Sequence, residues 1–420
     1  MARAEIITIG TEMLLGQLVD TNTAEIARAL FEIGVDVHRE TSVGDNEVRI
    51  AVAVREGLAR AEIVICAGGL GPTVDDMTRG AIAAAVGVPL TVDEPSMRHL
   101  EALFARLDRP MAENNRVQAH FPQGAAVFEN PHGSAPGFVI EHEGRAILAL
   151  PGPPRELFPM LRDHAIPWIE GRFEPDAAFV TRVLRTAGVG ESDLDARIAD
   201  LFREQKNPTI AMLAHPGLVD VKLTAKAETR AGAAAMIDEL EPVVRARLGD
   251  CIYGVGDVSL AGVIGDQLRS LALTLAVGES CTGGQLGAAF VAVPGASDYF
   301  HGGCIAYADQ AKTSLLGVSP DLIERFGAVS EAVAAAMALG AQAALGADVA
   351  LSTTGVAGPG GGTAEKPVGL VFVGMALPGG SVRVRRLDWP GSRDAIQRRA
   401  VIAALTMLWR ELAIRPAARG

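Results

Sequence analysis

Ser280 has the residue type and the setting of a catalytic nucleophile. It follows Leu273–Gly278, which has the composition of a buried strand, and it precedes a predicted helix. A side chain at such a strand-to-helix corner is presented at the edge of a sheet, where free amides can stabilise an oxyanion or a bound phosphate. The simpler alternative is that Ser280 only caps the helix.

Lys312 is the candidate base for this serine. It falls in the first turns of the helix predicted after the strand Gly303–Tyr307, where the helix dipole disfavours a cation. The dipole and partial burial favour a neutral amine, and such an amine within reach of a serine hydroxyl makes a Ser–Lys pair; a surface lysine is the alternative. Ser297 is a second hydroxyl candidate, which orients the lysine or caps a helix. Cys281 has no indicated histidine base and is interpreted as a packing residue.

The glycine-rich turn Ser352–Gly362 is a candidate anion site in the same part of the chain. It joins strands predicted at Ala347–Leu351 and Gly369–Met375, and its main-chain amides can wrap an anion. A flexible connection is the alternative. Arg393 and Arg399 are candidates for a phosphate contact, although arginines on a helix surface are common.

A second candidate site lies in the glycine-rich segment after the strand predicted at Ile63–Ala67. Glycines there let the backbone approach a ligand closely, and free amides at the start of the next helix attract phosphate. Neighbouring carboxylates suit Mg²⁺ or a similar divalent ion that bridges a diphosphate. The residues concerned are Gly68, Gly69, Gly71, Asp75 and Asp76. The alternative is a tight turn in which an aspartate caps the helix.

Glu12 and Asp20 strengthen this interpretation because they follow the first predicted strand, Ile6–Ile9. Open α/β sheets bind ligands beyond the carboxyl ends of their strands, so residues after neighbouring strands meet at one edge. Both residues have a simpler alternative: Asp20 can cap the helix that starts at Thr23, and Glu12 can be a surface residue.

The elements that position these residues alternate between short β-rich runs and Ala-rich helical segments. This alternation predicts α/β domains with largely parallel sheets. A small α+β unit begins near Gly171, with a strand at Phe179–Thr186 and a helix at Glu191–Glu204, and it contains few chemically active residues. Gly254–Asp257 is the predicted linker to the third segment.

The composition argues against several classes of protein. A formal charge of −12 is unsuited to a broad basic surface for nucleic acid, and the run Arg383, Arg385 and Arg386 is interpreted as a solvated strand face. The cysteines form no CxxC pair, which suits reduced thiols in a cytosolic enzyme. The N-terminus has no signal-peptide pattern, and no apolar run reaches the ~18 residues of a membrane span. We therefore expect a cytoplasmic protein with no membrane partner.

Long motifs make the sequence resemble the competence/damage-inducible (CinA) family over essentially its whole length. The N-terminal motifs are Ile9–Asn22, Gly68–Thr78, Gly133–Gly137 and Leu150–Glu156. The C-terminal motifs are Glu279–Gly284, Tyr307–Lys312, Gly327–Glu331, Thr354–Gly362 and Lys366–Gly369. The resemblance implies an α/β fold in three domains: a molybdopterin-binding-like α/β domain over 1–170, a small α+β KH-like domain over 171–257 and an α/β deamidase domain over 258–416. Gly188-Val189-Gly190-Glu191 lacks the GxxG spacing of an RNA-binding KH loop, so no nucleic-acid partner is expected.

The C-terminal part resembles nicotinamide mononucleotide deamidases, which convert this nucleotide and water to nicotinate mononucleotide and ammonia. By that resemblance Ser280 is the nucleophile, Lys312 is its base, and Tyr307 and Ser297 give hydrogen-bond support. The expected substrate contacts are Thr282, Gly283, Gly284, Thr354, Gly355, Gly358 and Arg399. Gln397 stands where relatives often carry an arginine, which leaves the role of that position in doubt. No cofactor is expected for this reaction.

The N-terminal domain is, in several members of the family, a metal-dependent ADP-ribose pyrophosphatase. The resemblance implies that glycine amides contact the phosphates and that a divalent metal of the Mg, Mn or Co type lies among carboxylates. These are Gly68, Gly69 and Gly71 for the phosphates and Asp75, Asp76, Glu12 and Asp20 for the metal. The leading hypothesis is a bifunctional, homodimeric enzyme of pyridine-nucleotide (NAD) salvage. The alternatives are a deamidase with an inactive N-terminal domain and a non-catalytic scaffold in DNA uptake.

Overall fold

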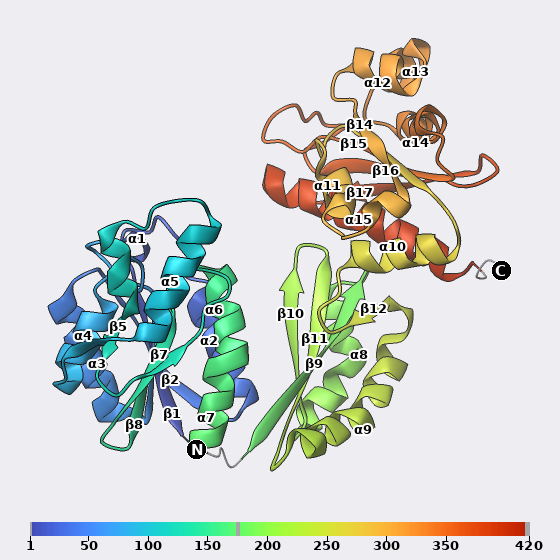
Figure 1. Cartoon of the computed structure of the whole chain (residues 1–420). Coiled ribbons are helices and arrows are strands. Elements are labelled where there is room, and N and C mark those ends of the chain that lie inside the picture. Colours follow the sequence, from blue (N-terminus) through green and yellow to red (C-terminus); the bar gives the residue numbers. More distant parts are fainter. Residues whose placement is uncertain (1, 174–176, 416–420) are drawn as a thin grey trace. The chain divides into compact units, whose positions relative to one another are not determined.

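The computed structural model describes residues 2–173 and 177–415. The chain divides into two compact units, residues 1–180 with 225–235 and residues 181–224 with 236–420. The first unit contains the N-terminal sheet, and the second contains most of the middle sheet and all of the C-terminal sheet (Figure 1). The domain limit predicted at residue 416 lies outside the described residues.

The N-terminal elements alternate as the sequence predicts. In chain order they are β1 (Arg3–Ile9), α1 (Thr11–Leu14), α2 (Asn22–Glu32), β2 (Asp36–Val43), α3 (Glu47–Arg60), β3 (Ile63–Ala67), α4 (Thr78–Val86), β4 (Leu90–Val92), α5 (Glu94–Arg106), η1 (Glu113–Ala119), β5 (His120–Pro122), β6 (Ala126–Phe128), β7 (Gly137–His142), β8 (Arg145–Leu150), α6 (Pro154–Met160), η2 (Leu161–Ala165) and α7 (Ile166–Phe173).

The N-terminal sheet has the strand order β2-β1-β3-β8-β7-β6. The first four strands run parallel, and β7 and β6 continue the sheet antiparallel. All five residues of β3 are buried, because α2, α6 and α7 pack on one face of the sheet and α3 and α4 on the other. Burial on both faces is why this strand reads as a continuous apolar run in the sequence.

The middle elements form a second sheet with the order β10-β11-β9-β12. In chain order they are β9 (Ala178–Ala187), α8 (Glu191–Glu204), β10 (Thr209–His215), β11 (Leu218–Ala227), α9 (Arg230–Leu248), η3 (Gly249–Cys251) and β12 (Ile252–Val255). β10 pairs antiparallel with β11, and β12 pairs antiparallel with β9. This is the small α+β unit that the sequence predicts.

The C-terminal elements form a third, mixed sheet with the order β14-β13-β15-β16-β17. In chain order they are α10 (Leu260–Ser270), β13 (Leu275–Glu279), α11 (Gln285–Val291), η4 (Ala296–Asp298), β14 (Phe300–Ile305), α12 (Asp309–Leu316), α13 (Pro320–Phe326), α14 (Glu331–Leu345), β15 (Val349–Gly355), β16 (Leu370–Ala376), β17 (Val382–Asp388) and α15 (Arg393–Ala413). α14 packs on one face of the sheet, and α10, α11 and α15 pack on the other (Figure 1).

The strands of this sheet depart from the sequence prediction in two ways. β14, β13 and β15 are parallel, but β16 and β17 pair antiparallel, so the prediction of largely parallel sheets is wrong for this half. β15 also extends to Gly355, so Ser352–Gly355 belongs to a strand and not to the glycine-rich turn. The reason is that these residues pair with β16 and are nearly all buried there.

None of the described helices is long and apolar enough to cross a membrane.

Candidate functional site

The main candidate site is a cavity of about 250 Å³ at the edge of the C-terminal sheet. β13, β14 and β15 are parallel, so their carboxyl ends meet at this edge, as at the ligand sites of open α/β sheets. Ser280 follows β13, and Tyr307 and Lys312 follow β14. These three residues, Arg393 and the glycine-rich segment 354–361 contribute to the lining.

Ser280 sits at the turn between β13 and α11. Its amide donates to the carbonyl oxygen of Thr353 on β15 at 2.9 Å, which continues the sheet pairing by one residue. Its side chain is 7% exposed and lines the cavity. The sheet therefore fixes the main chain that carries this hydroxyl.

The carboxylate of Glu279, one residue before Ser280, is buried and accepts four hydrogen bonds. The donors are the hydroxyl of Thr282 at 2.6 Å and the amides of Gly284 at 2.9 Å, Leu286 at 3.0 Å and Gly287 at 2.7 Å. A negative charge is stabilised at a helix N-terminus, so Glu279 fixes the turn that presents Ser280.

Thr282, Gly283 and Gly284 were predicted to supply oxyanion or phosphate contacts, and the structure shows other partners for several of their groups. The Thr282 hydroxyl and the Gly284 amide bond to Glu279, and the Gly283 amide donates to the Ser280 carbonyl oxygen at 3.2 Å. None of the three residues lines the cavity. The amides of Cys281 and Thr282 donate to no described residue, and of these two residues Cys281 lines the cavity.

Lys312 lies in the first turn of α12, where the sequence predicts it, and only 2% of the residue is exposed. Its Nζ donates to the carbonyl oxygen of Tyr307 at 3.0 Å and lies 3.4 Å from Oδ1 of Asp309. Nζ of Lys312 and Oγ of Ser280 are not hydrogen-bonded to each other among the described contacts. Both side chains line the same cavity, where a substrate group can lie between them.

Arg393, and not Arg399, is the arginine that lines this cavity. Its guanidinium donates to the carbonyl oxygen of Gly358 at 2.8 Å and to the hydroxyl of exposed Tyr307 at 3.2 Å. Arg399 donates to the carbonyl oxygen of Pro390 at 3.1 Å and lines a different cavity. The structure therefore does not bring Arg399, a predicted substrate contact, to the cavity that Ser280 and Lys312 line.

The glycine-rich segment contributes mainly main-chain groups to the lining. Thr354, Gly355 and Gly358, which the resemblance implies as substrate contacts, all line the cavity. The Thr354 hydroxyl is not free to donate to a ligand, since it donates to the carbonyl oxygen of Ala328 at 2.8 Å. An anion in the cavity would therefore meet the guanidinium of Arg393 and the backbone of this segment.

Ser297 lies at the other end of the sheet. It belongs to η4, immediately before β14, while Ser280 immediately follows β13, and the two strands are parallel with Leu275 beside Phe300. The length of these strands thus separates the two hydroxyls. Ser297 is exposed and does not line the cavity, so the structure does not bring it to Lys312, which it was predicted to support.

Cys281 and Gln397 fix the main chain beside Ser280. The Cys281 side chain is buried, and burial raises the pKa of its thiol to about 12, which is consistent with the packing role predicted for it. Its carbonyl oxygen accepts from Nε2 of Gln397 at 2.7 Å. The sequence left the role of position 397 in doubt, and the structure shows that the glutamine anchors this turn to α15.

The second candidate site lies at the carboxyl ends of β1, β3 and β8 in the N-terminal sheet. Gly68 has φ +107, and a Cβ there would lie 2.3 Å from the carbonyl oxygen of Ile9, so only glycine fits. The carbonyl oxygen of Gly68 accepts from the hydroxyl of Thr78 at 2.8 Å, which ties the loop to α4. Gly69 and Gly71 follow in this loop.

The carboxylates predicted to hold a metal are not gathered. Asp76 accepts hydrogen bonds from the amide and the hydroxyl of Thr73, and Asp20 accepts from the amide and the hydroxyl of Thr23 in the first turn of α2. In the described part of the chain, no group of three or more His, Cys, Asp or Glu side chains is placed to hold a metal ion. Protein ligands alone therefore do not form a closed metal site here.

Arg79 is a residue of this edge that the sequence analysis missed. It follows Thr78 at the start of α4, is 4% exposed and lies over the ring of Phe121, with its guanidinium carbon 5.6 Å from the ring centroid. None of its three guanidinium nitrogens has a hydrogen-bond partner among the described residues, and burial lowers its pKa to about 10. A cation in the first turn of a helix was the signal that singled out Lys312, and it applies here too.

Three sequence families match successive parts of the chain. Residues 5–171 match a probable molybdopterin binding domain, 181–254 the damage-inducible protein CinA KH domain and 257–412 the CinA C-terminal domain. A putative competence-damage inducible protein of Moorella thermoacetica is 46% identical over 410 residues, covering 98% of this chain and 99% of that protein. A CinA-like protein of Kosmotoga olearia is 41% identical with the same coverage. A crystal structure of competence/damage inducible protein CihA from Agrobacterium tumefaciens is 38% identical, covers 37% of this chain and 93% of that chain, and has a TM-score of 0.36.

Proposed function

Because the chain belongs to the competence-damage inducible (CinA) protein family, we propose that its C-terminal domain hydrolyses the carboxamide of nicotinamide mononucleotide. The products are nicotinate mononucleotide and ammonia. The observation that carries the proposal is that two buried groups, the Ser280 hydroxyl and the Lys312 amine, line one cavity at the carboxyl ends of parallel strands. A hydroxyl and an amine in that setting are a nucleophile and its base.

The reaction proceeds through an ester on the serine. Oγ of Ser280 attacks the carboxamide carbon and its proton passes to Nζ of Lys312, beside the Asp309 carboxylate that stabilises the resulting ammonium. Collapse of the tetrahedral intermediate breaks the C–N bond, and Lys312 returns the proton to the leaving ammonia. Water, deprotonated by Lys312, then attacks the ester and releases nicotinate with the Ser280 hydroxyl restored.

The other lining residues bind and stabilise charge in this scheme. The amide of Cys281, which lines the cavity and donates to no described residue, donates to the oxyanion. Arg393 and the main chain of the glycine-rich segment bind the nucleotide phosphate. Tyr307 orients both Lys312 and Arg393, because its carbonyl oxygen accepts a hydrogen bond from the lysine and its hydroxyl accepts one from the arginine.

Ammonia release from nicotinamide mononucleotide tests the proposal. Ser280→Ala and Lys312→Ala are each expected to lower turnover by at least ~10²-fold, the usual scale for removing a nucleophile or its base. Ser314→Ala is the matched control, because Ser314 is exposed on the same helix as Lys312 and does not line the cavity. Full turnover in Ser280→Ala, or the absence of any product with the wild type, would refute the assignment; the second result would favour a scaffold.

A second activity is proposed for the N-terminal domain, the cleavage of the diphosphate of ADP-ribose. The observation that favours it is the buried, unpaired guanidinium of Arg79, whose neighbour Thr78 bonds to the Gly68 loop, since a phosphate is the usual partner of such a group. The divalent metal expected for this reaction remains part of the proposal. Mg²⁺ is often held by one or two carboxylates together with substrate phosphates, and exposed Glu12 and Asp75 are available for that contact.

Product analysis with ADP-ribose, with and without Mg²⁺, Mn²⁺ or Co²⁺, tests the second activity. The double variant Asp75→Ala with Asp76→Ala is expected to lose metal-dependent cleavage and to keep ammonia release from nicotinamide mononucleotide. Retained deamidation serves as the internal control for folding. Wild-type protein that deaminates but leaves ADP-ribose intact with every metal would support a deamidase with an inactive N-terminal domain.

A further inference from the structure

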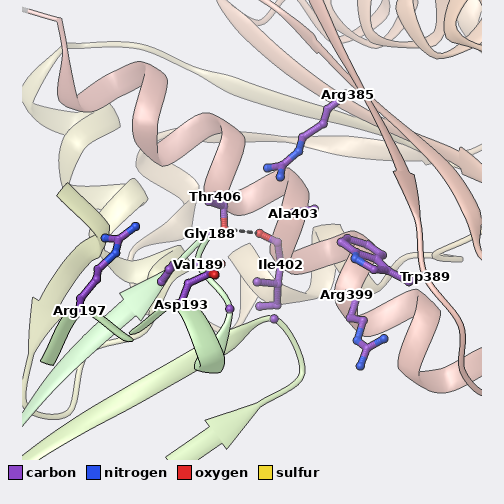
Figure 2. A pocket seen from close by; sticks show the side chains of 12 residues that line it. Gly188, Val189, Asp193, Arg197, Arg385, Trp389, Arg399, Ile402, Ala403 and Thr406 are labelled. Carbon is purple, nitrogen blue, oxygen red and sulfur yellow. Dashed lines mark hydrogen bonds between the residues drawn. The ribbon is translucent and has the colours of Figure 1, made fainter. Parts of the chain in front are cut away.

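A second cavity, of about 370 Å³, lies within the second unit between the middle sheet and α15. Its walls are the loop before α8, the turn between β10 and β11, the end of β17 and one face of α15 (Figure 2). Residues 399, 402, 403 and 406 face it, at the spacing of one side of a helix. The residues assigned to the deamidase do not line it.

Close approach of the backbone holds this interface together. A Cβ at Gly188 would lie 2.8 Å from Thr406, and a Cβ at Gly217 would lie 2.9 Å from Ile402, and both glycines have positive φ. The carbonyl oxygen of Gly188 also accepts from the guanidinium of Arg410 at 3.4 Å. The cavity is therefore bounded by turns that dock on α15.

Three arginines line the cavity, and none of them is paired with a carboxylate of the described residues. Arg197 and Arg399 bond only to main-chain carbonyl oxygens, those of Leu248 at 3.0 Å and Pro390 at 3.1 Å. Arg385 makes no hydrogen bond or ion pair within the described part of the chain. The single acidic side chain of the lining is Asp193, which is exposed and is not paired with any of the three arginines.

Arg385 differs from its neighbours on β17 in this respect. Arg383 forms an ion pair with Glu411 at 2.6 Å, and Arg386 lies 3.9 Å from Asp388. The sequence alone predicts a solvated strand face for all three arginines. In the structure the flanking two meet carboxylates while Arg385 extends toward α15 and lines the cavity (Figure 2). In a chain with a net charge of −12, an arginine left without a carboxylate points to an anionic ligand.

An aromatic surface lies beside these cations. Trp389 follows β17, and its half-buried indole and the side chains of Ile402 and Ala403 form the apolar part of the lining. Its main chain is fixed, because its amide donates to the carbonyl oxygen of Gly369. A flat ring can stack on the indole while an attached anion meets the arginines.

We propose that this cavity binds a mononucleotide, with its phosphate against Arg385 and its base against Trp389. A cavity of this size is in the range that holds one small ligand, which favours a single nucleotide over a nucleic-acid strand. The proposal goes beyond the deamidase and does not depend on it.

Isothermal titration of the full-length protein with AMP tests the site. Arg385→Ala is expected to weaken binding at least ~10-fold, because it removes a charged hydrogen bond to phosphate. Trp389→Leu is expected to weaken it at least ~5-fold through lost stacking. The matched control is Arg386→Ala, the adjacent arginine that is paired with Asp388, which should bind AMP as the wild type does. Far-ultraviolet circular dichroism and thermal midpoints confirm that each variant is folded.

Three further ligands establish the class of the occupant. Inorganic phosphate and adenosine are each expected to bind more weakly than AMP, since each lacks half of the contacts. The difference between wild type and Arg385→Ala isolates this cavity from nucleotide binding elsewhere in the chain. The proposal is overturned if AMP binds Arg385→Ala as tightly as the wild type, if phosphate alone matches AMP, or if a short single-stranded RNA binds more tightly than AMP with the same dependence on Arg385.

Discussion

Nε2 of Gln397 donates to the carbonyl oxygen of Cys281 across 2.7 Å, so α15 holds the main chain one residue beyond Ser280. The contact connects the last helix of the chain to the turn that carries the proposed nucleophile. It is made by a side chain that touches no reacting atom in the proposed scheme, so Gln397 is a positioning residue.

Replacing Gln397 by alanine should therefore lower kcat more than it raises KM. Loss of one neutral hydrogen bond costs about 1 kcal/mol, so a ~3–10-fold fall in kcat is expected in steady-state ammonia release. Gln397→Arg should restore much of the rate, because arginine can donate to the same carbonyl oxygen. Arg398→Ala is the control, since that neighbour is exposed and paired with Asp394. A change confined to KM would contradict the positioning role.

The buried carboxylate of Glu279 predicts an effect on stability. In Glu279→Gln an amide nitrogen replaces one acceptor oxygen, which leaves buried donors of α11 without a partner and costs about 1–3 kcal/mol of unfolding free energy. The urea midpoint of the second unit, followed by tryptophan fluorescence, should fall. Glu324→Gln, at an exposed position on α13, should leave the midpoint unchanged. Equal midpoints for Glu279→Gln and the wild type would show that the four hydrogen bonds contribute little.

The raised pKa of Cys281 predicts resistance to alkylation. Burial raises the pKa of its thiol to about 12, so at pH 8 the thiol is protonated and unreactive, since the thiolate is the nucleophile. Treatment with iodoacetamide at pH 8 should leave Cys281 unmodified by mass spectrometry and ammonia release intact. Modification of Cys281 that parallels the loss of turnover would instead identify a cysteine nucleophile.

Replacing Arg79 should affect ligand binding and thermal stability differently. A buried, unpaired charge costs free energy, so Arg79→Leu should leave the thermal midpoint unchanged or raise it, while ADP-ribose binding measured by titration calorimetry should weaken at least ~10-fold. If the variant is strongly destabilised and still binds ADP-ribose, Arg79 has a structural role and the second activity loses its main support.

Local signals in the sequence located the elements and the central pair. The buried strand Ile63–Ala67 and the helix Glu191–Glu204 have the bounds that their composition predicts, because burial on both faces and a polar-to-apolar helical pattern are properties of the segment itself. Ser280 and Lys312 were found because a corner after a strand and a cation in a first helical turn are also local features.

Features that depend on how segments meet were predicted poorly. Arg399 is six residues after Arg393, which at 3.6 residues per turn rotates its side chain by roughly 240° to another face of α15, toward the second cavity. Ser297 is near Lys312 in sequence, but it precedes a parallel strand while Ser280 follows one. The hydrogen bonds from the α11 amides to Glu279 form because the carboxylate lies against the turn that follows it. Residue spacing alone does not indicate this contact.

The central claim is that Ser280 and Lys312 act as one unit on a single carboxamide, and a double-mutant cycle of ammonia release measures this directly. Turnover is compared for the wild type, Ser280→Ala, Lys312→Ala and the variant with both substitutions. If the two groups form one nucleophile–base pair, the double variant is no more than about 3-fold slower than the slower single variant, because the second substitution removes nothing further. Losses that multiply, so that each substitution costs the same with or without the other, would show that the serine and the lysine do not work together.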